Sequence, residues 1–307
     1  MDELSLLTAL SVALVVALAG GMLARAIRLP AIIGYLAAGI AISPFTPGYV
    51  ADGHAIRQLA DLGVIFLMFG IGLHIRLADL LRLKGVVVPG ALIRMAAIVG
   101  LTFAARSVLE LDMREAIALG LTISIASTVV AIRALEERGE LDSQPGHIVV
   151  GWLIVEDLST VVILTVLPAL SPQQTGGVLL PTLIGLAKAV VFVAIMLTAG
   201  GWLVQWILVR IARTGSRELF ILATVGAALG IASGAAVLGI SVALGAFIAG
   251  VAISGSETSH QAAADVLPFR DAFAVLFFVS TGMLLDPAAV VQHVPELLVI
   301  LAIVVAG

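Results

Sequence analysis

Cysteine is absent from the 307-residue sequence, and charged residues make up only 12% of it. Without cysteine, the chain has no disulfide, no thiolate metal site and no cysteine nucleophile. Soluble domains usually carry about 25% charged residues, so this chain has too little polar surface for a soluble protein. A basic stripe that would predict a nucleic-acid partner is also missing, and the N-terminal residues 1–7 lack the basic start of a cleavable signal peptide.

Hydrophobic residues instead make up 61% of the sequence, and its mean hydropathy is +1.19. A helix needs roughly 20 apolar residues to cross the hydrocarbon core of a bilayer. By this rule the sequence predicts an all-α polytopic membrane protein, with a kink near Gly200 in its longest segment. About eleven segments are expected, at residues 4–23, 31–43, 57–73, 85–109, 113–134, 147–170, 178–210, 217–235, 237–254, 266–285 and 294–307.

Basic residues in the connecting loops predict the orientation, because Lys and Arg are enriched on the cytoplasmic side. One set of alternate loops holds only Arg57, Arg106 and Arg114. We therefore expect the N-terminus outside and the other loops in the cytoplasm. These other loops and helix entrances carry Arg25, Arg28, Arg76, Arg82, Lys84, Arg133, Arg138, Arg210, Arg213, Arg217 and Arg270.

An internal repeat is indicated by two sequence matches that occur in the same order. Residues 34–43 resemble 245–254 at an offset of 211, and residues 64–73 resemble 274–283 at an offset of 210. An odd number of predicted helices separates the copies, so the second copy is inverted in the membrane, as in many secondary transporters. We expect a first repeat over about 1–170, a linker helix over about 178–210 and a second repeat over about 217–307.

The second repeat is expected to be incomplete. The counterpart of the segment 113–134 would fall beyond Gly307, and the chain stops within an apolar run. A helix that ended inside the bilayer would leave its last carbonyl groups unsatisfied. We therefore interpret the chain as a C-terminally truncated membrane domain.

Two neighbouring carboxylates, Glu156 and Asp157, lie near the centre of the segment 147–170. A carboxylate at this depth costs at least a few kcal/mol unless it is protonated, paired or hydrated. A group that binds either a proton or a monovalent cation provides the simplest chemistry for exchange. The alternative is a structural carboxylate with Arg94 or Lys188 as its counter-charge, although these long side chains could also extend to an interface.

Three hydroxyl groups cluster in the segment 113–134, on Ser124, Ser127 and Thr128. Small polar residues can support a broken helix whose free carbonyl groups coordinate an ion. The alternative is ordinary helix packing, with each hydroxyl bonded to the preceding turn. Near the ends of other helices, Asp265 and Asp271 are interpreted as solvated residues.

Motifs spread over most of the chain resemble the monovalent cation:proton antiporter-2 family, in its potassium-efflux (Kef-type) branch. Any one of these motifs is weak alone, but their combination is specific. They are residues 29–39, 62–73, 127–128, 133–141, 155–158 and 276–283.

The resemblance implies thirteen helices, of which about eleven would be present, and an elevator-like motion of a core domain against a dimerisation domain. It assigns ion binding to Asp157 and matches Ser127 and Thr128 to hydroxyl groups of the crossing helix. Glu156 stands where the best-known potassium-efflux members have Gln, which leaves the charge stoichiometry open. The resemblance also implies a homodimer in a bacterial inner membrane and, in many members, a C-terminal nucleotide-binding regulatory domain.

The function expected from these features is antiport of K⁺ or Na⁺ against protons, with no cofactor and no enzymatic activity. A gated potassium channel is the main alternative. An intramembrane aspartyl protease needs two catalytic aspartates on separate helices, and only Asp157 lies deep in a predicted span. A membrane scaffold without transport activity would not explain the adjacent Glu156 and Asp157.

Overall fold

The computed structural model describes residues 3–46, 53–75, 77–166 and 179–307, and these residues form helices and no strands. Arg76, the end of the predicted segment 147–170 and the start of 178–210 lie outside the described residues. The helices are α1 (Glu3–Ala26), α2 (Ala31–Ala41), α3 (Gly53–His74), α4 (Leu77–Ala104), α5 (Met113–Ile123), α6 (Thr128–Arg138), α7 (Gln144–Val166), α8 (Leu179–Ile195), the π-helical turn η2 (Met196–Gly200), α9 (Gly201–Ala212), α10 (Arg217–Val237), α11 (Val242–Ser254), α12 (Ser259–Met283), α13 (Pro287–Gln292) and α14 (Val294–Ala306).

Six stretches of the described chain are both long and apolar enough to cross a membrane. Shorter apolar helices are α2, α11 and α14. The side chains of several long helices are largely exposed in the isolated chain, as expected for surfaces that face lipid. The six stretches are Leu7–Ala26, Ile56–His74, Arg82–Ala104, Met113–Arg138, Leu183–Ala212 and Arg217–Val237.

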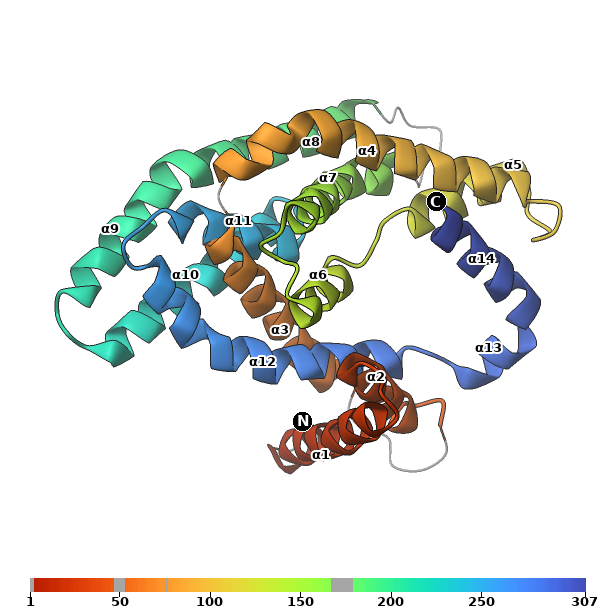
Figure 1. The fold of residues 1–307 in the computed structure, drawn as a ribbon, viewed down its shortest axis with the longest axis horizontal. Coiled ribbons are helices and arrows are strands. Elements are labelled where there is room, and N and C mark those ends of the chain that lie inside the picture. Colours follow the sequence, from red (N-terminus) through yellow and green to blue (C-terminus); the bar gives the residue numbers. More distant parts are fainter. Residues whose placement is uncertain (1–2, 47–52, 76, 167–178) are drawn as a thin grey trace.

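The centre of the molecule is formed by α3, which packs against α11 and α12, while α2 packs against α1 and α12 (Figure 1). Two pairs of glycines bring these helices into close contact. A Cβ atom on Gly72 would lie 2.9 Å from the Cα of Gly250, and one on Gly39 would lie 2.9 Å from the Cα of Gly282.

These two contacts are related by the repeat in the sequence. The repeat matches Gly39 to Gly250 and Gly72 to Gly282, and the structure pairs Gly39 with Gly282 and Gly72 with Gly250. The same contact therefore occurs twice. Each time, the first glycine of one copy of the repeat meets the second glycine of the other copy. Small residues at both crossings are what allow the backbones to approach so closely.

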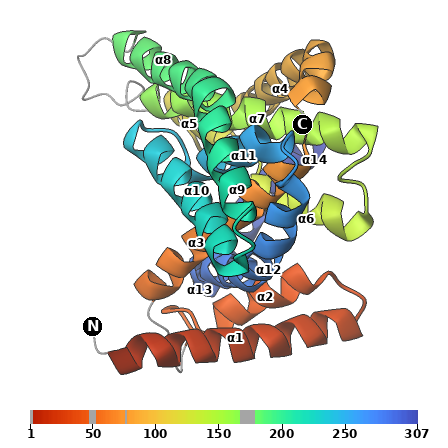
Figure 2. The same ribbon diagram turned by 90° about the vertical axis from the view of Figure 1, so that its left-hand side faces the viewer.

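A second group of helices lies on the other side of α3, α11 and α12 from α1 and α2 (Figure 2). In this group α4 packs against α5, α7 and α14. A glycine again permits the close approach of α4 and α7, because a Cβ atom on Gly151 of α7 would lie only 2.8 Å from the Val87 side chain of α4.

Several predicted segments differ from the observed helices. The segment 113–134 is two helices, and 178–210 contains the π-helical turn just before the predicted kink. The segment 85–109 instead begins at Leu77 and ends at Ala104, and 266–285 begins at Ser259. Hydropathy detects only the apolar part of a helix, so it misses polar turns that continue beyond that part, and it also missed the short α13.

Candidate functional site

The predicted segment 113–134, together with the rest of α6, is called the crossing segment below, and it is interrupted between α5 and α6, at residues 124–127. At its start, α5 has a capping box in which Asp112 accepts from the Glu115 N–H group and Glu115 accepts from the Asp112 N–H group. At the start of α6, the Ser127 hydroxyl accepts a hydrogen bond from the Val130 N–H group. The break leaves backbone groups of both helix ends without partners inside a helix.

Glu156 of α7 occupies this break and is only 2% exposed. Its Oε1 atom forms an ion pair with Arg94 of α4, and its Oε2 atom accepts a hydrogen bond from the Ala126 N–H group at 3.0 Å. Arg94 also donates to the Ser124 carbonyl group at 3.1 Å. The Arg94–Glu156 pair therefore connects α4, the break and α7, and its two charges cancel.

Asp157 is the next residue of α7 and points about 100° away around the helix. Its side chain is half-buried. The Thr128 hydroxyl, in the first turn of α6, donates to the Asp157 Oδ1 atom at 3.3 Å. Within the described ranges, no basic side chain lies within ion-pair distance of Asp157, so its charge has no direct counter-charge.

The other predicted polar residues have more ordinary surroundings. The Ser124 hydroxyl is buried and donates to the Leu121 carbonyl group at 2.8 Å, which is the packing alternative considered above. Ser127 caps α6, so Thr128 is the hydroxyl of the three that contacts a carboxylate. Lys188 is exposed, and no carboxylate in the described part of the chain pairs with it.

The interpretation of Asp265 as a solvated residue was wrong. Its side chain is 6% exposed and pairs with Arg217 of α10 at 3.0 Å. Asp271 is 51% exposed, as predicted. A further ion pair joins Glu136 of α6 to Arg270 of α12 at 2.8 Å.

Sequence reasoning missed this Glu136–Arg270 pair and also the Ala126 N–H group as a ligand of Glu156. Residues 136 and 270 are far apart in the chain, and nothing local marks them as partners. The break itself could be predicted from its hydroxyl residues, but a backbone donor has no sequence signal.

Comparison with known proteins gives a family model described as "Sodium/hydrogen exchanger, transmembrane", which matches residues 11–307. The chain is 49% identical to the putative cation/proton antiporter YbaL of Escherichia coli K12, over 98% of this chain and 55% of that protein. It is 33% identical to K(+) efflux antiporter 1, chloroplastic, of Arabidopsis thaliana, over 90% of this chain and 24% of that protein. The chain thus spans about half, or less, of the length of these two relatives.

A solved structure, the sodium proton antiporter MjNhaP1 from Methanocaldococcus jannaschii, matches with a TM-score of 0.59. The two chains are 19% identical, and the match covers 97% of this chain and 75% of that one. A likeness at this identity shows the antiporter fold, and the apolar helices agree with a multi-pass membrane protein. With a family model that covers almost all of its length, the chain belongs to the sodium/hydrogen exchanger transmembrane family, as its Kef-type motifs predicted.

Proposed function

We propose that this chain is the ion-translocating part of a monovalent cation/proton antiporter, in which Asp157 binds a proton and a K⁺ or Na⁺ ion in turn. The observation that carries the proposal is the half-buried Asp157 carboxylate, which lies beside a broken helix and has no ion-pair partner among the described residues. The names of the antiporter relatives support the same class of activity.

The surroundings of Asp157 suit a ligand that is positively charged and small. A carboxylate oxygen, the Thr128 hydroxyl and free carbonyl groups at a helix break are the kinds of oxygen that coordinate alkali cations in transporters. A proton on Asp157 removes the charge that holds the metal ion. The two ligands therefore compete for one group, which couples their movements.

We also propose that the exchange is electroneutral, with one cation for one proton. Glu156 is neutralised by Arg94, so Asp157 contributes the one uncompensated negative charge of the pair. In this proposal Glu156 has a structural role, and Ser124 and Ser127 support the break rather than bind the ion directly.

The test compares Asp157→Asn with the wild type in everted membrane vesicles, with a pH-sensitive dye as the readout. Asn cannot exchange a proton, so cation-dependent proton movement is expected to disappear at normal expression. The exposed Asp142→Asn serves as the matched control and should retain activity. A one-for-one exchange moves no net charge, so an imposed membrane potential should leave the antiport rate of the wild type unchanged.

Normal antiport by Asp157→Asn would remove Asp157 from the mechanism. A rate that depends on membrane potential would contradict the one-for-one exchange while leaving antiport intact. Cation flux that carries no protons would support a gated channel instead.

The remaining assignments come from the sequence and its resemblance to the family, and we propose them on that basis. The N-terminus would lie outside a bacterial inner membrane, and the chain would form a homodimer. A nucleotide-binding regulatory domain would accompany the membrane domain in the whole protein.

A further inference from the structure

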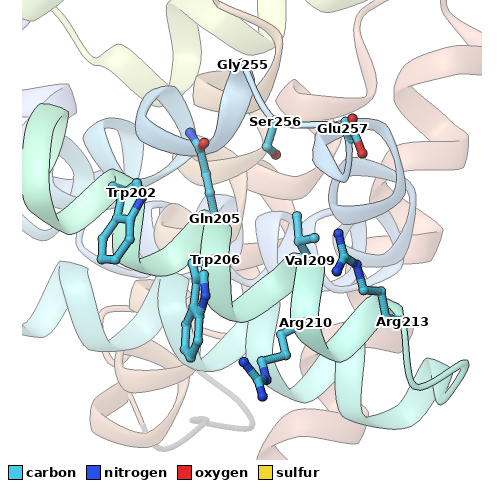
Figure 3. A pocket seen from close by; sticks show the side chains of 9 residues that line it. All are labelled: Trp202, Gln205, Trp206, Val209, Arg210, Arg213, Gly255, Ser256 and Glu257. Carbon is cyan, nitrogen blue, oxygen red and sulfur yellow. The ribbon is translucent and has the colours of Figure 1, made fainter.

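A hollow of about 720 Å³ lies between α9 and the turn that joins α11 to α12 (Figure 3). Trp202, Trp206 and Arg210 line it from α9, Arg213 lines it from the residue that follows α9, and Glu257 lines it from the turn. The two indole side chains are 67% and 48% exposed. None of these residues takes part in the proposed ion site.

The residues of α9 that line this hollow are of the types that occur at a membrane–water interface. Trp202, Trp206 and Arg210 follow one another at a spacing of four residues, so they form a stripe on one face of the helix. Tryptophan is enriched at the membrane–water interface, and α9 is the last part of the apolar stretch Leu183–Ala212. We therefore expect the stripe to pass from the hydrocarbon at Trp202 to the aqueous side at Arg210.

The two arginines provide positive charge that the described protein does not neutralise. Arg210 lies over the Trp206 ring, with 5.2 Å from its Cζ atom to the ring centre. Neither Arg210 nor Arg213 forms an ion pair within the described ranges, whereas the nearby Arg217 pairs with Asp265. Guanidinium groups bind phosphate with paired, charge-assisted hydrogen bonds.

The opposite wall of the hollow carries a negative charge. Glu257 is exposed on the α11–α12 turn and forms no ion pair among the described residues. Figure 3 shows the Arg213 side chain extending from the end of α9 toward this turn. A ligand that fits both walls has a phosphate group at one end and a cationic group at the other.

We propose that this hollow binds the headgroup of a phospholipid with a phosphoethanolamine headgroup. Its phosphate binds Arg210 and Arg213, its primary ammonium binds Glu257, and its acyl chains lie along Trp202 and Trp206. Choline lacks the N–H donors that a carboxylate accepts, and the neutral glycerol of a phosphoglycerol lipid leaves Glu257 without a cationic partner. The bound lipid would join α9 to the α11–α12 turn.

The test uses the chain reconstituted in phosphatidylcholine vesicles that contain a small fraction of one lipid with brominated acyl chains. Bromine quenches tryptophan fluorescence at short range, and two of the three tryptophans line the hollow. Brominated phosphatidylethanolamine should bind roughly tenfold more tightly than brominated phosphatidylcholine, the effect expected for added charge-assisted hydrogen bonds. Inorganic phosphate in the buffer should not displace it.

Three variants assign the headgroup to its residues. The double variant R210Q/R213Q should lose the additional quenching by the ethanolamine lipid, and E257Q should lose the discrimination between ethanolamine and choline. R106Q is the matched control, since Arg106 also lies over an aromatic ring, that of Phe103 at 4.6 Å, but outside this hollow. Correct folding of each variant is verified by its elution in size-exclusion chromatography.

Equal quenching of the wild type by the ethanolamine and choline lipids would overturn the proposal. Stronger quenching by a brominated phosphatidylglycerol would overturn the headgroup assignment, and displacement by inorganic phosphate would indicate a site for free phosphate. Unchanged lipid preference in both R210Q/R213Q and E257Q would show that binding occurs elsewhere on the chain.

Discussion

Glu156 and Asp157 are adjacent on α7, but their surroundings give them different properties. Glu156 is buried, bonded to a backbone N–H group and paired with Arg94, whereas Asp157 is half-buried and has Thr128 as its one hydrogen-bond partner among the residues that the structure describes. One turn of a helix spans 3.6 residues, so neighbours in sequence face different parts of the protein. The free carboxylate is therefore the candidate ion ligand, and the paired one holds the break in position.

Thr128→Val removes the hydroxyl that donates to Asp157 and keeps the shape of the side chain. A hydrogen bond to a charged group contributes about 1.5–3 kcal/mol, so the half-saturating cation concentration should rise by roughly tenfold or more. Thr128→Ser should restore it. Cation titration of antiport in everted vesicles measures the change, and Thr122→Val is the matched control because that hydroxyl bonds to its own helix at Ala118. Equal affinities for wild type and Thr128→Val would exclude the hydroxyl from the ion site.

Glu156→Gln should destabilise the protein because it leaves the Arg94 guanidinium without its carboxylate. Breaking a buried pair from one side costs about 3–5 kcal/mol. Arg94→Gln should have a similar effect, and the double variant should be more stable than the sum of the two losses predicts. Thermal unfolding in detergent measures all four proteins. Strictly additive losses would mean that the pair does not hold the two helices together.

At the scale of elements, the break between α5 and α6 depends on contacts from two other helices. Capping residues allow α5 and α6 to begin and end where they do, and Gly139, with φ of 67°, terminates α6. Arg94 and Glu156 then satisfy backbone groups of the break that no helix could satisfy. In this geometry Glu156 is buried and bonded at both carboxylate oxygens, whereas Asp157 is half-buried and accepts one hydrogen bond from a side chain among the described residues.

Gly72→Ala tests the crossing of α3 with α11. The added Cβ atom would meet the backbone of α11, including the Gly250 Cα atom at 2.9 Å, so the two helices must move apart. We expect a loss of about 1–3 kcal/mol, the usual cost of overpacking, and a lower Tm in detergent. Gly226→Ala on α10 meets nothing within 4 Å and should not lower the Tm. An unchanged Tm for Gly72→Ala would contradict a tight crossing.

At the scale of the whole molecule, the Glu136–Arg270 ion pair joins α6 of the crossing segment to α12, which packs on α3. Both side chains are largely buried, at 15% and 14% exposed. If the helices around the proposed ion site move as one body against the remaining helices, the Glu136–Arg270 pair stabilises the arrangement in which α6 contacts α12. Beside it, Ala263 and Glu137 line a hollow of about 680 Å³ between the same elements.

Glu136→Gln should favour arrangements in which this hollow is wider. The chain has no cysteine, so Ala263→Cys introduces a single reactive thiol for labelling with a maleimide. A partly buried ion pair contributes about 1 kcal/mol, which predicts roughly fivefold faster labelling. Glu137→Gln, at an exposed neighbouring carboxylate, should leave the rate unchanged. Equal rates for the two variants would mean that the Glu136–Arg270 pair does not hold α6 against α12.

The sequence by itself determined the membrane class and the positions of most helices, and it predicted the repeat and the candidate residues Glu156, Asp157 and Thr128. These features follow from local composition and from the cost of placing charge in a bilayer, which each stretch of chain carries alone. Only the tertiary structure decided that Glu156 is neutralised and Asp157 is not. Arg94 is 62 residues from Glu156 in the chain, and no local pattern specifies which of two adjacent carboxylates a distant helix will contact.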